Sequence, residues 1–147
     1  MFGPQNYEVF HMSEVVAEAL SDNKTKLKKL EKKVTYQDPC RLGRFCGIFD
    51  PPREMIKASG AEFLEMPKNR KNAICCGTSS WVNCDAYSRM IQANRLKEAK
   101  STGAEILITA CPKCQIHFSC TQNAEGYPEK DRIKIIDLAT LFAQVLT

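Results

Sequence analysis

The chain has 147 residues, enough for one domain with a sizeable hydrophobic core, and its apolar fraction of 44% and charged fraction of 26% are ordinary for a globular protein. A net charge of +4 is too small to indicate nucleic-acid binding by itself, and no apolar run approaches the roughly 20 residues of a membrane span. The first residues lack the basic and apolar regions of a secretory signal, so we expect a cytoplasmic protein with no direct membrane insertion and no nucleic-acid partner.

Residues 1–32 form the N-terminal part of the predicted domain. Residues 7–12 (YEVFHM) predict a strand, and Ser13 is the expected N-cap of a helix that continues through residues 14–20. The segment 24–33 (KTKLKKLEKK) carries six lysines and one glutamate. It is interpreted as a solvated connector, with a docking patch for an acidic partner as the alternative.

The rest of the chain alternates between short apolar segments and helical patterns. Four segments predict buried strands, and three longer patterns predict helices. The strands are residues 33–37, 61–66, 105–110 and 133–138, and the helices are residues 51–59, 83–100 and 138–147. This alternation predicts a small Rossmann-like α/β domain with a mostly parallel sheet of four to five strands and helices on both faces.

Two of these helices have apolar stripes. In residues 83–100 the apolar side carries Ala86, Tyr87, Met90, Ile91 and Ala93, and the opposite side carries Ser88, Arg89, Gln92 and Arg95. This pattern predicts an amphipathic surface helix, although Leu96 falls outside the apolar stripe. The last helix has a stripe of Leu138, Leu141, Phe142 and Val145, which predicts core packing.

The chain contains eight cysteines, and five of them follow predicted strands. A cysteine-rich chain in a reducing compartment favours metal or redox chemistry over structural disulfides. Because the carboxyl ends of parallel strands meet at one edge of a sheet, we expect these five thiols to converge there. They are Cys40, Cys75, Cys76, Cys111 and Cys114.

The thiol chemistry leaves more than one ligand open. A structural zinc ion and a regular iron–sulfur cubane each take four ligands, whereas five thiolates suit a multinuclear cluster. Cys111 and Cys114 form a CPKC motif that should open a helix, whose N-terminal dipole lowers thiol pKa values. Nearby basic residues either offset the site's negative charge and attract an anionic substrate, or are plain surface charges. They are Arg41, Arg44, Arg70, Lys71 and Lys113.

Three segments together resemble a known family. YQDPCRLGR (36–44), CCGTSSW (75–81) and ACPKC (110–114) are similar to the CCG domain, the cysteine-rich domain of heterodisulfide reductase catalytic subunits. The resemblance extends to residues 50–70 and 103–114. It implies that residues 1–147 form one CCG domain, with residues 33–147 as the cysteine-motif core. It implies a non-cubane [4Fe-4S] cluster held by the five cysteines above, although some related motifs hold zinc.

The sequence also departs from that family. Gln37 stands where many relatives have histidine, the loop after CCG lacks their glycines, and only one motif set is present. Outside the motif, Cys46, Cys84 and Cys120 are expected to be buried apolar residues. Cys84 and His117 are nevertheless the candidates for a catalytic role, as a substrate-exchange thiol and a proton donor. Trp81 is expected to shield the site.

These observations predict an iron–sulfur oxidoreductase domain or subunit, similar to heterodisulfide reductase, that transfers electrons to or from a disulfide. The resemblance implies other redox subunits, iron–sulfur or flavin proteins, as partners. A structural zinc module that docks redox subunits, and a thioredoxin-like dithiol exchanger built on CPKC, are the alternatives. The sequence leaves the substrate, the metal and the partner subunits open.

Overall fold

The computed structural model describes residues 6–22, 25–77 and 85–147, and its centre is a four-stranded parallel sheet. The strands are β1 (Lys33–Gln37), β2 (Glu62–Phe63), β3 (Ile106–Thr109) and β4 (Lys134–Asp137), in the order β2-β1-β3-β4. All three neighbouring pairs are parallel. The four strands predicted after residue 32 are therefore confirmed, β1 with its predicted bounds and the other three with shorter ones, as is the α/β class.

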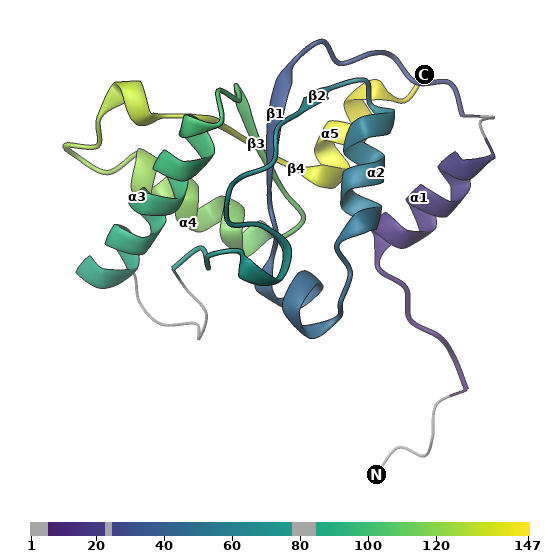
Figure 1. Ribbon diagram of the computed structural model, residues 1–147, viewed down its shortest axis with the longest axis horizontal. Helices are drawn as coiled ribbons and strands as arrows, with labels where there is room; N and C mark the ends of the chain where they lie inside the picture. Colours follow the sequence, from purple (N-terminus) through teal and green to yellow (C-terminus); the bar gives the residue numbers. More distant parts are fainter. Residues whose placement is uncertain (1–5, 23–24, 78–84) are drawn as a thin grey trace.

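Helices cover both faces of this sheet (Figure 1). On one face lie α1 (Met12–Ser21), α2 (Asp50–Ala58) and α5 (Leu138–Val145), and on the other lie α3 (Ala86–Ser101) and α4 (Pro112–Gln122). Short helical turns η1 (Arg41–Phe45), η2 (Arg70–Asn72) and η3 (Glu129–Asp131) lie in the connections. No helix within the described ranges is long and apolar enough to cross a bilayer.

The alternation of side chains along β3 divides the core in two. Ile106 and Ile108 point toward α2 and α5, where they pack with the predicted apolar stripe of α5. Leu107 points the other way and packs with Leu96 of α3 and Phe118 of α4. Four cysteines belong to or border this second core, which places the cysteine chemistry on the α3–α4 side of the sheet.

The N-terminal predictions are partly wrong. Residues 6–11 form no strand, and Val9 and Phe10 are exposed instead of packing on the sheet. The helix begins at Met12, one residue before the predicted N-cap. His11 caps it instead, since its ring nitrogen accepts from the Ser13 N–H while the Glu14 carboxylate accepts from the His11 N–H.

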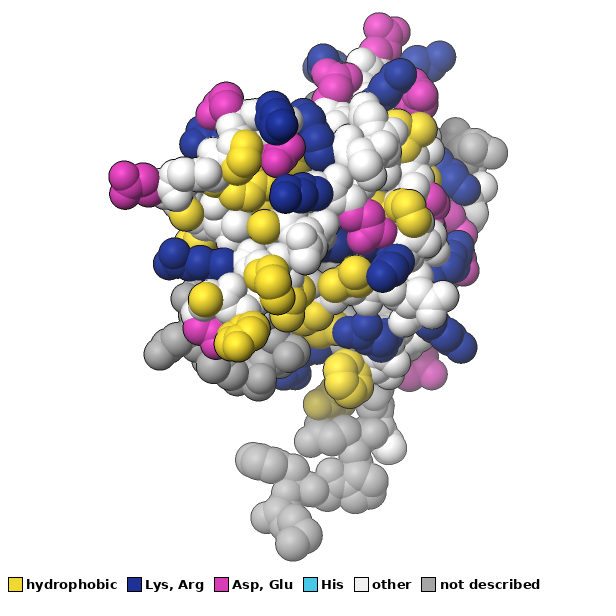
Figure 2. Space-filling model, turned by 60° about the vertical axis from the view of Figure 1, so that its left-hand side comes forward, with side chains coloured by type: hydrophobic (Ala, Val, Ile, Leu, Met, Phe, Trp, Pro, Cys, Tyr) yellow, Lys and Arg dark blue, Asp and Glu magenta, His cyan; other side chains and the backbone are white. Residues whose placement is uncertain are grey.

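The burial of α3 is the reverse of what its pattern predicts. Gln92 and Arg95 are fully buried, whereas Tyr87 is 75% and Met90 is 54% exposed. The polar side faces inward because its buried side chains find hydrogen-bond partners there. Gln92 is hydrogen-bonded to Thr121 of α4, and Arg95 is hydrogen-bonded to Gln37 of β1. Figure 2, which brings the α3–α4 side forward, shows apolar side chains exposed among lysines and arginines.

The order of the strands creates a switch point between β1 and β3. From β1 the chain first crosses to β2 on one side and later returns to place β3 and β4 on the other side. The carboxyl ends of β1 and β3 therefore lead into helices on opposite faces, which is where ligand sites form in sheets of this kind. Gln37 and Thr109, the last residues of the two strands, are partners in the sheet register.

Candidate functional site

Two of the predicted site cysteines leave the sheet at this switch point. Cys40 follows β1 by three residues and starts η1, and Cys111 follows β3 by two residues and is the N-cap residue of α4. Pro112 occupies the first turn of α4, a position where its missing N–H costs nothing. The predicted helix opened by CPKC is therefore confirmed.

The CPKC motif holds one thiol ready to ionise beside one that keeps its proton. The pKa of Cys111 is lowered to about 6, first by a hydrogen bond from the Cys114 thiol and further by the backbone N–H groups of Cys114 and Lys113. The pKa of Cys114 is raised by its hydrogen bonds with Cys111 and Cys76 and by burial. Cys111 is the thiolate of this pair at neutral pH.

The vicinal cysteines reach the same place from another segment. Cys76 is buried and its sulfur is hydrogen-bonded to Cys114, so thiols from two distant motifs meet. Cys75 is half-buried and packs against the same apolar cluster. Gly77 then turns the chain with a φ of +81°, and a Cβ atom there would lie 2.6 Å from the carbonyl oxygen of Ser88. Only glycine meets both conditions without strain.

Two side chains anchor the backbone that carries these cysteines. The Nε2 of Gln37 donates to the carbonyl oxygen of Ile74 at 3.0 Å, directly before Cys75. The Nη1 of Arg44, in η1, donates to the carbonyl oxygen of Ala73 at 2.7 Å. The segment 73–77, which we call the vicinal-cysteine loop, is therefore tied to both β1 and η1, although the sequence suggested no such role for Gln37.

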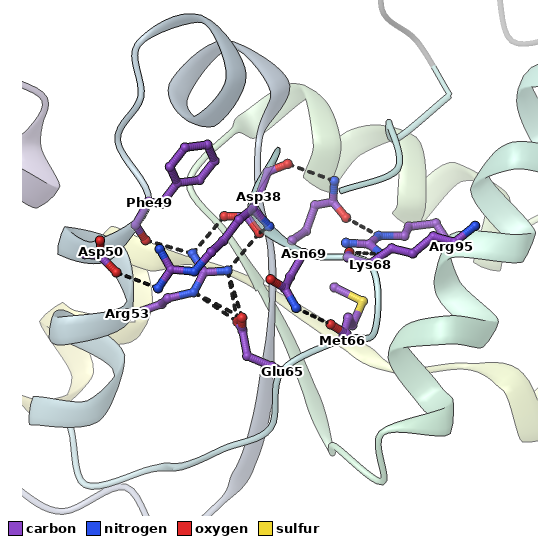
Figure 3. Close-up of polar contacts among 11 residues, drawn as sticks. Asp38, Phe49, Asp50, Arg53, Glu65, Met66, Lys68, Asn69 and Arg95 are labelled. Atoms are coloured by element: carbon purple, nitrogen blue, oxygen red, sulfur yellow. Dashed lines mark hydrogen bonds and ion pairs between the residues drawn. The ribbon is translucent and has the colours of Figure 1, made fainter. Parts of the chain in front are cut away.

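A buried ion-pair network lies on the other side of β1. Both oxygens of Asp38 accept from Arg53 of α2 at 2.8 Å, and both side chains are 3% exposed. Arg53 also donates to Glu65, and the backbone N–H of Arg70 donates to Asp38 at 2.7 Å. Figure 3 shows Arg53 and Arg95 approaching the end of β1 from opposite sides. This network fixes the segment that leads into Cys40.

Cys40 itself lines a cavity of about 720 Å³ next to η1. The other lining residues in the described part of the chain are Arg41, Arg44, Phe45 and Cys46. Cys40 is not part of the hydrogen-bonded group of Cys76, Cys111 and Cys114. The structure thus brings three predicted ligands into contact, packs Cys75 beside them, and places Cys40 on η1, which Arg44 ties to the vicinal-cysteine loop.

The predicted basic residues have different surroundings. Arg41 and Lys71 are exposed, which leaves both original interpretations open for them. Arg44 is used to hold Ala73, and Arg70 forms an ion pair with Asp50 at 2.5 Å. Lys113 contributes its backbone N–H to the environment of Cys111.

The remaining candidates are placed less centrally. Cys46 and Cys120 are exposed, so the expectation that they are buried is wrong; Cys46 directly follows η1 and lines the cavity beside it. His117 is half-buried on α4, and its Nδ1 has no hydrogen-bond partner among the described residues. The catalytic candidate Cys84 and the shielding candidate Trp81 lie outside the described residues.

The donor set agrees with a soft metal centre. The thiols are sulfur ligands, which bind iron–sulfur clusters and zinc in preference to hard cations, and one of them ionises below neutral pH. The apolar cluster behind them, with Leu107 and Phe118, keeps water from the inner side. Within residues 6–22, 25–77 and 85–147, no group of three or more His, Cys, Asp or Glu side chains has the arrangement of a single-ion site.

Comparison with known proteins identifies the family of the chain. A family model described as the cysteine-rich domain, CCG, matches residues 34–119. The match covers all three segments that carry the sequence resemblance, and it confirms that resemblance.

Several relatives match nearly the whole chain. A subunit of the dihydromethanophenazine:CoB--CoM heterodisulfide reductase of Methanosarcina acetivorans is 33% identical over 95% of this chain. The "Probable iron-sulfur-binding oxidoreductase FadF" of Bacillus subtilis is 32% identical over 93%, and the EtfAB:quinone oxidoreductase of Syntrophomonas wolfei is 34% identical over 91%. The chain spans 34% of the first of these proteins and 20% of each of the other two.

Proposed function

The chain belongs to the CCG cysteine-rich domain family, and from that premise we propose that it is the iron–sulfur domain of an electron-transferring oxidoreductase. Its ligands are Cys40, Cys75, Cys76, Cys111 and Cys114, holding a non-cubane [4Fe-4S] cluster. The substrate is a disulfide or another small acceptor, and further redox subunits exchange electrons with the domain. The names of the relatives, which include a heterodisulfide reductase subunit and an iron–sulfur-binding oxidoreductase, support this assignment.

One contact carries the proposal. The Cys114 sulfur is hydrogen-bonded with both Cys111 and Cys76, which joins the CPKC motif to the vicinal pair at the carboxyl edge of the sheet. A cluster that takes ligands from both motifs needs this approach. A dithiol exchanger needs only Cys111 and Cys114, so the presence of Cys76 in the same group favours the cluster.

The chain's own residues have separate roles in such a site. Cys111 is already ionised near neutral pH and is the first thiolate available to a metal. Cys76 and Cys114 lose their protons on binding, at a place backed by the start of α4. Gln37 and Arg44 hold the vicinal-cysteine loop in place, and the second apolar core excludes water. When bound, the cluster supplies one-electron transfer.

Metal and sulfide analysis of the full chain tests the proposal. Protein purified or reconstituted without oxygen should contain iron and acid-labile sulfide and absorb visible light. Cys76→Ser and Cys40→Ser should each lose that absorbance. Cys120→Ser should keep it, because Cys120 is exposed and lies outside the motif. Zinc without sulfide in the unmodified protein would instead indicate the structural zinc module.

Spectroscopy of the oxidised protein tests the substrate class. Electron paramagnetic resonance with and without small thiols should show a new signal when a thiol reaches the cluster. A spectrum unchanged by every thiol tried would limit the domain to electron transfer between subunits.

A dithiol exchanger is the second candidate, because the lowered pKa of Cys111 and its Cys114 neighbour also suit that chemistry. The Cys111 thiolate would attack a disulfide and release one thiol. Cys114 would then displace the second thiol, leaving a Cys111–Cys114 disulfide. If the second candidate is right, metal-free protein carrying Cys40→Ala should retain thiol-exchange activity. If the first candidate is right, Cys40→Ala should abolish the visible absorbance of protein reconstituted with iron and sulfide.

A further inference from the structure

The backbone before the vicinal cysteines depends on the orientation of one amide side chain. Gln37 is 1% exposed, and its Nε2 donates to the carbonyl oxygens of Ile74 and Asp38. An amide group can turn over and exchange its oxygen for its nitrogen. If Gln37 turned over, its oxygen would face the Ile74 carbonyl oxygen and the anchor would become a repulsion.

Arg95 fixes that orientation. Its Nε donates to Oε1 of Gln37 at 2.6 Å, so the oxygen of the amide must face α3 and the nitrogen must face the loop. Its Nη1 donates to the carbonyl oxygen of Lys68 at 2.8 Å and to Glu98 at 2.7 Å. Arg95 is therefore held from two further sides while it holds Gln37.

This arrangement is costly for a residue that only fills space. Arg95 is fully buried, and its Nη2 has no hydrogen-bond partner in the part of the chain that the structure describes. A buried ion pair commonly adds little stability compared with apolar residues of the same volume. An apolar side chain at this position would avoid a buried guanidinium with an unpaired nitrogen, but it would give up the bond to Oε1 of Gln37. The cost points to a task beyond packing.

We propose that Gln37 and Arg95 are positioning residues for the vicinal-cysteine loop: Arg95 sets the amide of Gln37, and Gln37 sets the backbone that presents Cys75 and Cys76. The proposal rests on the proposed function for the purpose of that positioning, but the coupling consists of hydrogen bonds between protein groups. It can therefore be measured with and without a bound cluster.

Hydrogen–deuterium exchange on the metal-free full chain tests the first link. Gln37→Glu keeps an oxygen for Arg95 and removes the donor to Ile74. Peptides spanning residues 74–77 should exchange about five to ten times faster, as expected for one lost buried hydrogen bond. Peptides at the start of α4, residues 111–115, should be unchanged.

Gln122→Glu is the matched control. Gln122 also makes an amide-to-backbone bond, from Nε2 to the carbonyl oxygen of Ile133 at 3.0 Å, but it lies at the end of α4 next to the amino end of β4. Its change should leave the exchange of residues 74–77 as in the unmodified protein. Equal effects of the two changes on the loop, or equal acceleration of the loop and α4 in Gln37→Glu, would overturn the proposal.

A double-mutant cycle tests the second link. Arg95→Lys keeps the charge and loses the Nε donor, so it should accelerate exchange of the same loop peptides. In a Gln37→Glu background it should add little, because the donor that it controls is already absent. Fully additive effects would mean that Arg95 does not act through Gln37. Glu98→Gln, which loosens Arg95 at Nη1 only, replaces Arg95→Lys if that variant does not fold.

Iron retention tests the purpose of the coupling. In the reconstituted protein, Gln37→Glu should lose iron to a chelator several-fold faster than Gln122→Glu, which should match the unmodified chain. If Gln37→Glu kept its iron as long as the unmodified chain, the position of the vicinal-cysteine loop would not affect cluster binding, and this part of the proposal would be wrong. If the unmodified chain binds no iron, the proposed function fails, and the exchange measurements still decide whether Gln37 and Arg95 position the loop.

Discussion

At the end of β1 two consecutive residues, Gln37 and Asp38, point to opposite faces of the sheet. Each bonds to a buried arginine, and the two arginines have different surroundings. Asp38 meets Arg53, whose three side-chain nitrogens are all bonded, with Glu65 as a second carboxylate and the Tyr36 ring 5.3 Å away. Gln37 meets Arg95, which has one carboxylate partner, Glu98, and one nitrogen without a partner among the described residues.

This difference separates a contact that holds the fold from one that holds the site. The Arg53 network joins β1, α2 and the segments after β2, all of which form the frame of the domain. Arg95 also bonds to Lys68 and Glu98, but its bond to Gln37 leads on to the vicinal-cysteine loop. We therefore expect damage at Arg53 to appear as global instability and damage at Arg95 to appear mainly at the loop.

Arg53→Met should give the largest loss of stability. It leaves the Asp38 carboxylate buried without its ion-pair partner, and breaking a buried pair from one side costs about 3–5 kcal/mol. Urea unfolding of the metal-free protein, followed by circular dichroism, measures the change. Arg132→Met is the control, because its partner Glu129 is 83% exposed and the loss should stay below about 1 kcal/mol. Similar losses for both would show that the Arg53 network does not hold the frame.

The sequence predicted the frame better than the site. Short, largely apolar segments located β1, β3 and β4, and the cysteine motifs identified the edge where Cys76, Cys111 and Cys114 meet. Spacing along the chain has no information on which polar residues are paired inside the protein. The sequence pattern therefore predicts that the polar side of α3 faces solvent. In the structure this side faces the interior, where Arg95 bonds to Gln37 and Gln92 bonds to Thr121.

A signal for this reversal was present in the sequence. Leu96 falls outside the predicted apolar stripe of α3, and it is fully buried beside Arg95. A helix with its strongest apolar residue on the polar side has an ambiguous face. The polar interior explains which face turned inward, because Gln92 and Arg95 both find hydrogen-bond partners there.

Arg95→Met should have a smaller effect on global stability than Arg53→Met. Glu98 is 15% exposed and can regain water, so we expect a loss of about 1–3 kcal/mol from the unpaired oxygen of Gln37. Hydrogen exchange should nevertheless rise first at residues 74–77, which distinguishes it from Arg53→Met. A global loss as large as that of Arg53→Met, with no preference for the loop, would remove the distinction between the two networks.

Asp50→Asn should give the smallest effect. The pair of Asp50 and Arg70 lies beside the Arg53 network but is exposed, with side-chain exposures of 66% and 43% in that order, so its loss should cost at most about 0.5 kcal/mol. The pKa of Asp50 is lowered by a hydrogen bond from Arg70, so the stabilisation is present above the carboxyl's ordinary pKa and disappears as the pH falls through the lowered value. Urea unfolding at several pH values should show the unmodified protein slightly more stable than Asp50→Asn at neutral pH and equal to it in strong acid. If the difference in stability between the two proteins grew as the pH fell, Arg70 would not be what stabilises the Asp50 carboxylate. The exposed pair would then be coupled to the buried carboxylates of the Arg53 network.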